Sequence, residues 1–123
     1  YADYLTTADS EMCLVVQIET PAGVAALDDI LAVEGVDAVF IGPSDLSANY
    51  GHIGNPGAPE VVEAVQSSLD KIAASDKASG IMALDPAAAK SYLDRGVDFV
   101  AVSIDARTLA LSLRAIAADM RNR

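Results

Sequence analysis

The chain has few of the residues that mark several large classes of protein. It contains no Trp, two Phe and a single Cys, and 8 Lys and Arg stand against 18 Asp and Glu. One Cys excludes a disulfide framework, and the reducing cytoplasm is the expected compartment. A net charge of −10 argues against a nucleic-acid surface, which needs clustered Lys and Arg. No apolar run approaches the roughly 18 residues of a membrane span.

What is present favours a packed α/β protein. Hydrophobic residues make up 52% of the 123 positions, enough for one core, and we expect residues 1–123 to form a single domain. Residues 1–8 resemble the tail of a helix and include no Met, so we expect the C-terminal part of a longer protein. Cys13 lies in an apolar strand-like run, where a packed core residue is favoured over a reactive thiol.

Apolar runs of strand length alternate with segments of helical period. The predicted strands cover residues 13–18, 36–41, 79–83 and 98–103, and the predicted helices begin near residues 21, 59, 86 and 106. Thr20 before Pro21, and Asp85 before Pro86, are helix-start signals. A face with Val24, Leu27 and Leu31 is expected in the first of these helices. This alternation predicts βα units and a parallel sheet.

A short internal repeat supports the same scheme. GVDAVFIG at residues 35–42 matches GVDFVAVS at residues 96–103 in residue type at nearly every position. We interpret each copy as a helix-ending Gly followed by a strand that is buried on both faces. Four βα units are half of an eight-stranded barrel, and a half barrel leaves two parallel edges that need a partner.

Two carboxylates follow neighbouring predicted strands, at the point where each strand gives way to a turn. Glu19 follows the first strand, and Asp45 follows the second strand and its Gly-Pro-Ser turn. The carboxyl ends of parallel strands lie at one edge, where ligands bind in α/β folds. Asp45 alone could be a helix cap. The two acids together favour a divalent cation, Mg²⁺ or Mn²⁺, with water and substrate oxygens as the other ligands.

The neighbours of these acids suggest a substrate site. Gly42, Pro43 and Ser44 form either an ordinary tight turn or a backbone cradle for a carboxylate. Gln17 lies two positions before Glu19, so both side chains point to the same side of a strand. The sole histidine, His52, is in a long loop, where closing the loop by hydrogen bonds is favoured over catalysis.

Lysine chemistry is not indicated in this stretch. The three lysines lie on predicted helices or just after one, and none follows a strand. A Schiff-base mechanism is therefore not expected from them. No phosphate-binding Gly-rich motif, zinc pattern or serine nucleophile turn is present in the sequence.

Three motifs, in order, carry a family resemblance. VQIETP at 16–21, GVDAVFIGPSDLS at 35–47 and GHIGNP at 51–56 closely resemble the HpcH/HpaI aldolases, which are metal-dependent pyruvate aldolases related to the citrate lyase β subunit. GIMA at 80–83 and FVAVSID at 99–105 extend the likeness. The resemblance implies the C-terminal half of a (β/α)₈ barrel of the phosphoenolpyruvate/pyruvate-domain type.

By position, the resemblance implies that Glu19 and Asp45 bind Mg²⁺ or Mn²⁺, with Co²⁺ as a further option. It implies that Gln17 and the backbone of Gly42, Pro43 and Ser44 hold the pyruvate portion of a 2-oxo acid. The implied reaction cleaves 4-hydroxy-2-oxo acids to pyruvate and an aldehyde through a metal-stabilised enolate. The family's general-base His and substrate-binding Arg belong to the other half of the barrel, so this chain contains no assigned base.

Two alternatives stay open at this point. One is a non-catalytic half barrel that assembles through its open edges; the other is a CoA-ester lyase of the citrate lyase β type. The loop GHIGN at 51–55 points toward the aldolases. The resemblance also implies a homo-oligomer, often a hexamer, in which the C-terminal helix packs across subunits. The surplus apolar residues of that helix, Leu109, Leu111, Leu113, Ile116 and Met120, fit such an arrangement.

Overall fold

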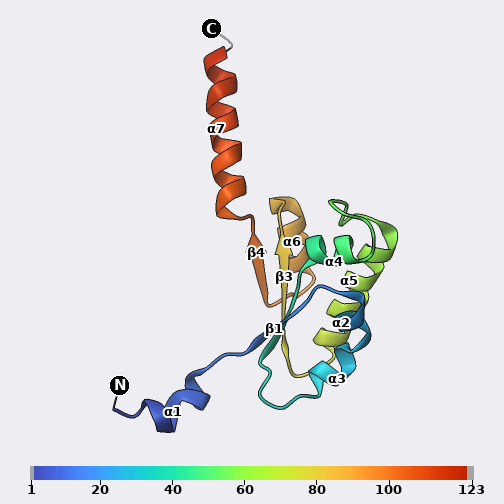
Figure 1. Cartoon of the computed structure of the whole chain (residues 1–123), viewed down its shortest axis with the longest axis vertical. Coiled ribbons are helices and arrows are strands. Elements are labelled where there is room, and N and C mark those ends of the chain that lie inside the picture. Colours follow the sequence, from blue (N-terminus) through green and yellow to red (C-terminus); the bar gives the residue numbers. More distant parts are fainter. Residues whose placement is uncertain (1, 122–123) are drawn as a thin grey trace.

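A single parallel sheet organises the chain (Figure 1). The computed structural model describes residues 2–121. The strands are β1 (Val15–Ile18), β2 (Ala38–Ile41), β3 (Ala78–Ala83) and β4 (Phe99–Val102), and they lie side by side in chain order. All three pairings are parallel. The predicted fold class is confirmed: this is an α/β fold of four consecutive βα units, as in half of a (β/α)₈ barrel.

The helices alternate with the strands. They are α1 (Tyr4–Glu11), α2 (Pro21–Ala25), α3 (Leu27–Leu31), α4 (Pro43–Asn49), α5 (Pro59–Ala73), α6 (Pro86–Asp94) and α7 (Asp105–Arg121). Both predicted caps are present, since Thr20 accepts a hydrogen bond from the Gly23 amide and Asp85 accepts one from the Ala88 amide. The single helix expected after Pro21 is instead two short helices that meet at Ala26.

One face of the sheet is covered by helices and carries the core. Ile18, Ile41 and Ile81 form one row across three neighbouring strands, and all three are almost fully buried. The helix side chains that pack against this face are Leu27, Leu46, Val61, Val65, Leu69 and Ile72. The face predicted for the first helix is confirmed at Leu27, which is fully buried, and its neighbours Val24 and Leu31 pack against the same core.

The opposite face of the sheet is only partly covered. Gln17, Phe40, Gly80 and Phe99 share one register row across all four strands. The Phe40 and Phe99 rings stack with centroids 5.4 Å apart. A Cβ on Gly80 would lie 2.3 Å from Phe99 Cζ and 2.8 Å from Phe40 Cδ2. A glycine is therefore needed between the two aromatic strands because both rings lie over it.

Two burial predictions are wrong. Cys13 is exposed, because β1 begins only at Val15 and the segment before it leads in from α1 without packing on the core. The strand of the second repeat copy is not buried on both faces either. Phe99 is 40% exposed and Val102 is 48% exposed, since β4 is an edge strand with a neighbour on one side only.

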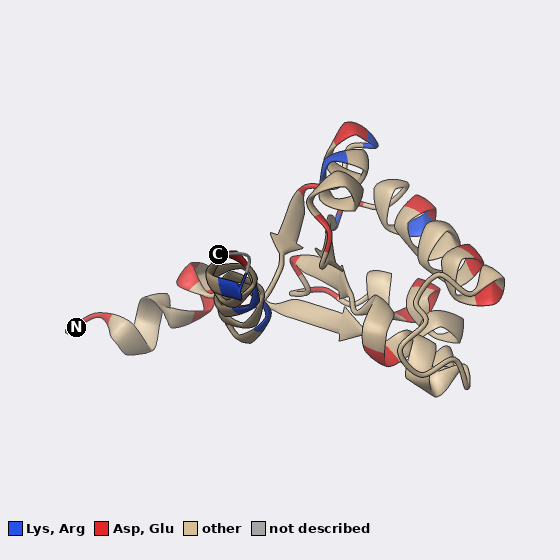
Figure 2. Ribbon diagram, turned by 90° about the horizontal axis from the view of Figure 1, so that it is seen from above, with Lys and Arg blue, Asp and Glu red and all other residues tan. Residues whose placement is uncertain are grey.

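The last helix leaves the sheet altogether. In Figure 1, α7 projects away from the βα layers, and none of its residues is buried. Its apolar side chains Leu109, Leu111, Leu113, Ile116 and Met120 are all at least 48% exposed. Viewed from above, Figure 2 shows Lys and Arg positions along α7. Among the described residues, no helix is both long and apolar enough to cross a membrane.

Candidate functional site

The carboxyl ends of β1 and β2 bring the two predicted acids to one edge. Ile18 pairs with Ile41 at the last position of both strands, and Gly42 N–H donates to Ile18 O at 3.0 Å. Glu19 follows β1 directly, and Asp45 lies in the first turn of α4, which follows β2. The predicted placement of both acids at neighbouring strand ends is confirmed.

Asp45 is not a helix cap, so that alternative is wrong. The helix begins at Pro43, two residues earlier than a cap at Asp45 requires, with Gly42 as its N-terminal neighbour. Proline favours this start because its fixed φ and missing N–H suit the first helical position. No side-chain cap bond forms at this end. Asp45 is therefore an exposed first-turn carboxylate that is left available for a ligand.

Glu19 is oriented by Gln17. Gln17 Nε2 donates to Glu19 Oε2 at 2.7 Å, as expected from two residues on the same side of a strand. Gly42 packs against this pair: a Cβ there would lie 2.9 Å from Gln17 Nε2 and 3.5 Å from Glu19 Oε2. The absence of a side chain at Gly42 therefore keeps open the space beside the Glu19 carboxylate.

Asn49 links the two acid segments. Its Nδ2 donates to Glu19 O at 3.1 Å and to Asp45 O at 3.0 Å. One nitrogen atom thus touches the chain after β1 and the chain after β2. Sequence reasoning missed Asn49, and the available signal was modest: it lies four residues after Asp45, one turn along the same short helix.

A cavity of about 140 Å³ opens beside these residues. It is lined by Gln17, Phe40, Gly42, Pro43, Ser44, Asp45 and Met82. The structure thus gathers five of the predicted site residues around one small space. Of the two predicted metal ligands only Asp45 lines it, and Glu19 is joined to it through its hydrogen bond with Gln17. Phe40 and Met82 were not predicted, although strand alternation places both on the same face as Gln17 and Gly42, where they add an apolar wall.

His52 lies in the loop after α4 and is not among the residues that line this cavity. Its Nε2 contacts the Glu60 carboxylate in the first turn of α5, and its backbone N–H donates to Ser47 O at 2.8 Å. Asn55 N–H in turn donates to His52 O at 2.9 Å. These contacts match the loop-closing interpretation of His52 rather than the catalytic one.

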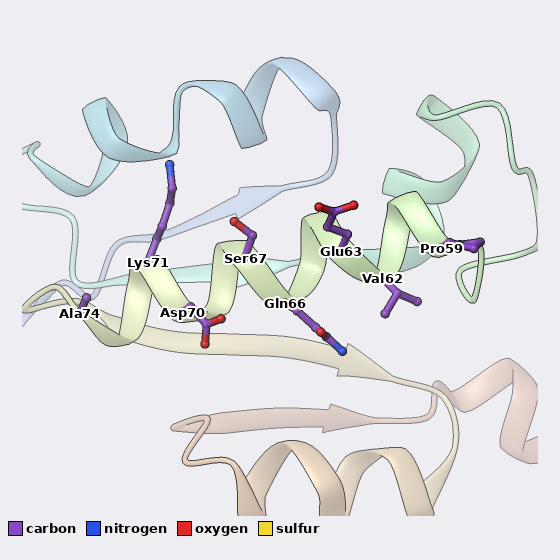
Figure 3. A pocket seen from close by; sticks show the side chains of 8 residues that line it. All are labelled: Pro59, Val62, Glu63, Gln66, Ser67, Asp70, Lys71 and Ala74. Carbon is purple, nitrogen blue, oxygen red and sulfur yellow. The ribbon is translucent and has the colours of Figure 1, made fainter.

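A wider hollow of about 760 Å³ lies elsewhere. Figure 3 shows that its lining side chains, from Pro59 to Ala74, all project from α5 and its C-terminal end. Lys71 there donates to Asp28 Oδ2 at 2.7 Å, and Asp70 accepts from Arg95 Nη2 at 2.6 Å. Two of its three charged groups, Asp70 and Lys71, are thus paired, and this shallow surface has no residue in common with the strand-end cavity.

Comparison with known proteins decides the family. Residues 4–111 match the model of the HpcH/HpaI aldolase/citrate lyase family. The chain belongs to this family. It is 50% identical to a hydroxypyruvate/pyruvate aldolase of Roseovarius nubinhibens, over 97% of this chain and 46% of that protein. It is 49% identical to a 4-hydroxy-2-oxo-heptane-1,7-dioate aldolase of Escherichia coli, over 94% of this chain and 44% of that protein.

Solved structures of other proteins share the fold. A family member from Burkholderia cenocepacia superposes with a TM-score of 0.90 at 37% identity, covering 97% of this chain and 46% of that one. Macrophomate synthase, at 24% identity, shares the fold with a TM-score of 0.82. This HpcH/HpaI chain therefore spans about half the length of the relatives that it matches.

The site of this HpcH/HpaI chain suits a hard divalent cation. The described residues contain no group of three or more His, Cys, Asp or Glu placed to hold a metal. Glu19 and Asp45 are hard oxygen donors, and an ion that keeps several water or substrate ligands needs only one or two carboxylates. The space that a Cβ at Gly42 would fill lies beside the Glu19 carboxylate. The donor set and this gap fit Mg²⁺ or Mn²⁺ better than a closed zinc site.

Proposed function

We propose that residues 1–123 form the C-terminal half of one barrel domain that cleaves 4-hydroxy-2-oxo acids to pyruvate and an aldehyde. The observation that carries the proposal is the strand-end edge, where Glu19 and Asp45 follow adjacent parallel strands beside a small cavity. Relatives at 49–50% identity are named hydroxypyruvate/pyruvate aldolase and 4-hydroxy-2-oxo-heptane-1,7-dioate aldolase, which supports a reaction of this class.

The cofactor in this proposal is a divalent ion, Mg²⁺ or Mn²⁺, with Co²⁺ as a further option. Glu19 and Asp45 would hold it, and when bound it would supply Lewis-acid polarisation of the 2-oxo group. Gln17 fixes the direction of the Glu19 carboxylate through their 2.7 Å hydrogen bond. The ion, rather than the carboxylates that hold it, would favour an anionic 2-oxo acid over a neutral substrate, because carboxylate and keto oxygens are the hard ligands that such ions take.

The pyruvate portion would occupy the cavity that Gly42, Pro43 and Ser44 help to line. The Ser44 amide, in the first turn of α4, has no helical acceptor and can donate to the substrate carboxylate. Phe40 and Met82 would exclude water from the methyl or methylene group of the pyruvate portion. Cleavage breaks the bond between C3 and C4 while the 4-hydroxyl proton passes to a base and C4 becomes the aldehyde carbon. The electron pair of that bond passes to C3, which takes up a proton to give pyruvate.

That base is not supplied by the cavity residues of this chain. The cavity lining contains one carboxylate, Asp45, which the proposal assigns to the metal, and no His or Lys. The proposal therefore places the base in the other half of the barrel, which faces the partly covered side of the sheet. A non-catalytic half barrel is the competing reading, and it predicts no turnover in any assembled form.

We propose that the working protein is a homo-oligomer, such as a hexamer. The support is α7, whose apolar side chains are exposed along its whole length. Arg107, Arg114 and Arg121 recur at seven-residue intervals on this helix, in a chain with a net charge of −10. A basic stripe beside an apolar one suits the acidic surface of a second copy. Light scattering at micromolar concentration should give a mass well above one subunit, and a monomer mass would refute this part.

The test of the reaction is pyruvate release from 4-hydroxy-2-oxo acids by the assembled barrel, with Mn²⁺ or Mg²⁺ and then with excess chelator. We expect turnover that chelation stops and that added metal restores. Borohydride reduction in the presence of pyruvate should leave no covalent adduct on residues 2–121, because no described lysine follows a strand. Turnover that survives chelation together with a reduced adduct would establish a Schiff-base enzyme instead. Activity on acyl-CoA esters alone would establish the citrate lyase type.

A further inference from the structure

The link made by Asn49 is unlike the other contacts of α4. The sheet ladder between β1 and β2 continues only as far as Gly42 N–H on Ile18 O. Beyond that point, and among residues 2–121, the bond from Asn49 Nδ2 to Glu19 O is the one hydrogen bond between α4 and the chain that follows β1. The same nitrogen also donates to Asp45 O, so both of its hydrogens are used.

Helix geometry explains only half of this arrangement. A polar side chain that bonds the carbonyl four residues earlier is a common local pattern within a helix. The bond to Glu19 O crosses 30 positions of sequence and joins two different βα units. Local structure does not require it. Its effect is to tie together the backbone carbonyls of the two residues whose carboxylates form the proposed metal site.

We propose that Asn49 is a positioning residue of the metal site. Its side-chain amide holds the Glu19 and Asp45 segments at a fixed separation, so that both carboxylates reach one ion without reorganisation. The inference rests on the proposed function, because it concerns the same two ligands. Partners that orient metal ligands typically contribute 10- to 100-fold in metal affinity, which sets the expected size of the effect.

The decisive variant is Asn49→Asp. It keeps the shape of the side chain but replaces the donating amide with a carboxylate, which can only accept. Facing two carbonyl oxygens, it would push the two segments apart. Its added negative charge, taken alone, would tighten cation binding. The two effects therefore have opposite signs, and the positioning role predicts that Mn²⁺ affinity falls at least about tenfold.

Mn²⁺ binding is measured by the loss of the free-ion electron paramagnetic resonance signal, on the assembled barrel and without substrate. Asn49→Ala, which removes the donor without adding charge, should also weaken binding by about tenfold or more. Asn55→Ala is the matched control, because Asn55 lies in the loop that follows α4 and its hydrogen bonds among the described residues are made by its backbone. We expect its Mn²⁺ affinity to stay within about twofold of the unaltered protein.

Kinetics provide a second readout. If Asn49 only positions the ligands, saturating Mn²⁺ should restore most of kcat in Asn49→Ala, whereas the Mn²⁺ concentration for half-maximal rate rises at least about tenfold. A merely structural role would instead lower the metal-free unfolding midpoint and leave the Mn²⁺ affinity of the folded fraction unchanged. That result would overturn the inference, and so would failure of both Asn49 variants to fold.

Failure of the inference can be distinguished from failure of the proposed function. If the unaltered protein binds Mn²⁺, Asp45→Ala abolishes binding, and Asn49→Asp binds as tightly as the unaltered protein or more tightly, only the inference is wrong. If the unaltered protein does not bind Mn²⁺ at all, the proposed metal site and the inference are both wrong.

Discussion

The two copies of the internal repeat, at residues 35–42 and 96–103, begin in the same way. Gly35 and Gly96 have φ values of 87° and 96°, a region that only glycine occupies without strain. The aspartate of each copy then accepts a backbone hydrogen bond at the start of the preceding strand: Asp37 from the Leu14 amide, just before β1, and Asp98 from the Ser79 amide in β3, both at 2.7 Å. The register makes these two bonds equivalent. Local sequence therefore produces the same local structure twice.

The copies differ in their surroundings. In the first, β2 lies between two strands and Ile41 is fully buried, whereas in the second, β4 lies at an edge and the equivalent Val102 is 48% exposed. Similar apolar strands thus have different burial, because burial depends on neighbours that the strand sequence does not encode. The comparison shows that the repeat specifies a strand and the turn that precedes it. The position of the strand in the sheet determines how much its side chains contribute to stability.

The copies also differ where they end. The first leads through Gly42 to Asp45, which lines the strand-end cavity, and the second leads through Ser103 to Asp105 at the start of α7. Asp105 lines none of the cavities described above. Its Oδ1 accepts a hydrogen bond from the Ala106 amide. Only the first copy contributes a carboxylate to the proposed site.

The largest effect is expected from removing that carboxylate. Asp45→Ala should lower Mn²⁺ affinity by more than about a hundredfold and abolish metal-dependent pyruvate release, because a direct ligand matters more than an outer partner. The fold should persist, since Asp45 is exposed. Asp105→Ala, at the end of the other copy, should change both readouts by less than about twofold. Full activity in Asp45→Ala would show that Asp45 is not a metal ligand.

The second largest difference between the copies is expected in the free energy of unfolding. Ile41→Ala should lower the free energy of unfolding by about 3 kcal/mol, because it leaves a cavity in a fully buried position. Val102→Ala should cost under about 0.5 kcal/mol in the isolated chain, where β4 is an edge. Urea titration measures both. A cost at Val102 that rises in the assembled protein would show that another strand or subunit covers β4 there.

The aromatic pair that joins the copies offers a smaller effect. Phe40 and Phe99 meet over Gly80, so Gly80→Ala should destabilise the chain by about 1–2 kcal/mol through overpacking. In a chain that already carries Phe99→Ala, the substitution Gly80→Ala should cost less stability than it does in the unaltered chain, because the closest ring atoms are gone. Additive costs in urea titration would show that the rings do not restrict this position.

The smallest effect concerns acid. The Ser79 amide and hydroxyl, which donate to Asp98, hold the pKa of that carboxyl below its usual range. A lowered folded-state pKa adds stability that is fully present above the unfolded value of about 3.9 and is lost as pH falls through the folded value. The stability difference between the unaltered chain and Asp98→Asn should therefore shrink below about pH 4. A stability difference that stays constant from pH 7 to pH 3 would contradict this account.

Sequence reasoning reached the strand-end acids because their position depends only on strand order and direction. It placed Gln17 correctly beside Glu19 because side-chain alternation along a strand is local. It missed Asn49, Phe40 and Met82 because their contacts require knowing how α4 and β3 lie relative to β1. It misplaced Cys13 because an apolar residue before a strand is buried only if something packs on it.

The sequence by itself determined the order of elements, the helix caps at Thr20 and Asp85, and the left-handed glycines that begin each repeat copy. These features depend on backbone sterics and hydrogen bonds within a few residues. Only the tertiary structure decided that Asn49 joins the Glu19 and Asp45 segments, that Phe40 and Phe99 stack over Gly80, and that β4 and α7 are left uncovered. Each of these depends on distances between elements, which are set by packing and not by local propensity.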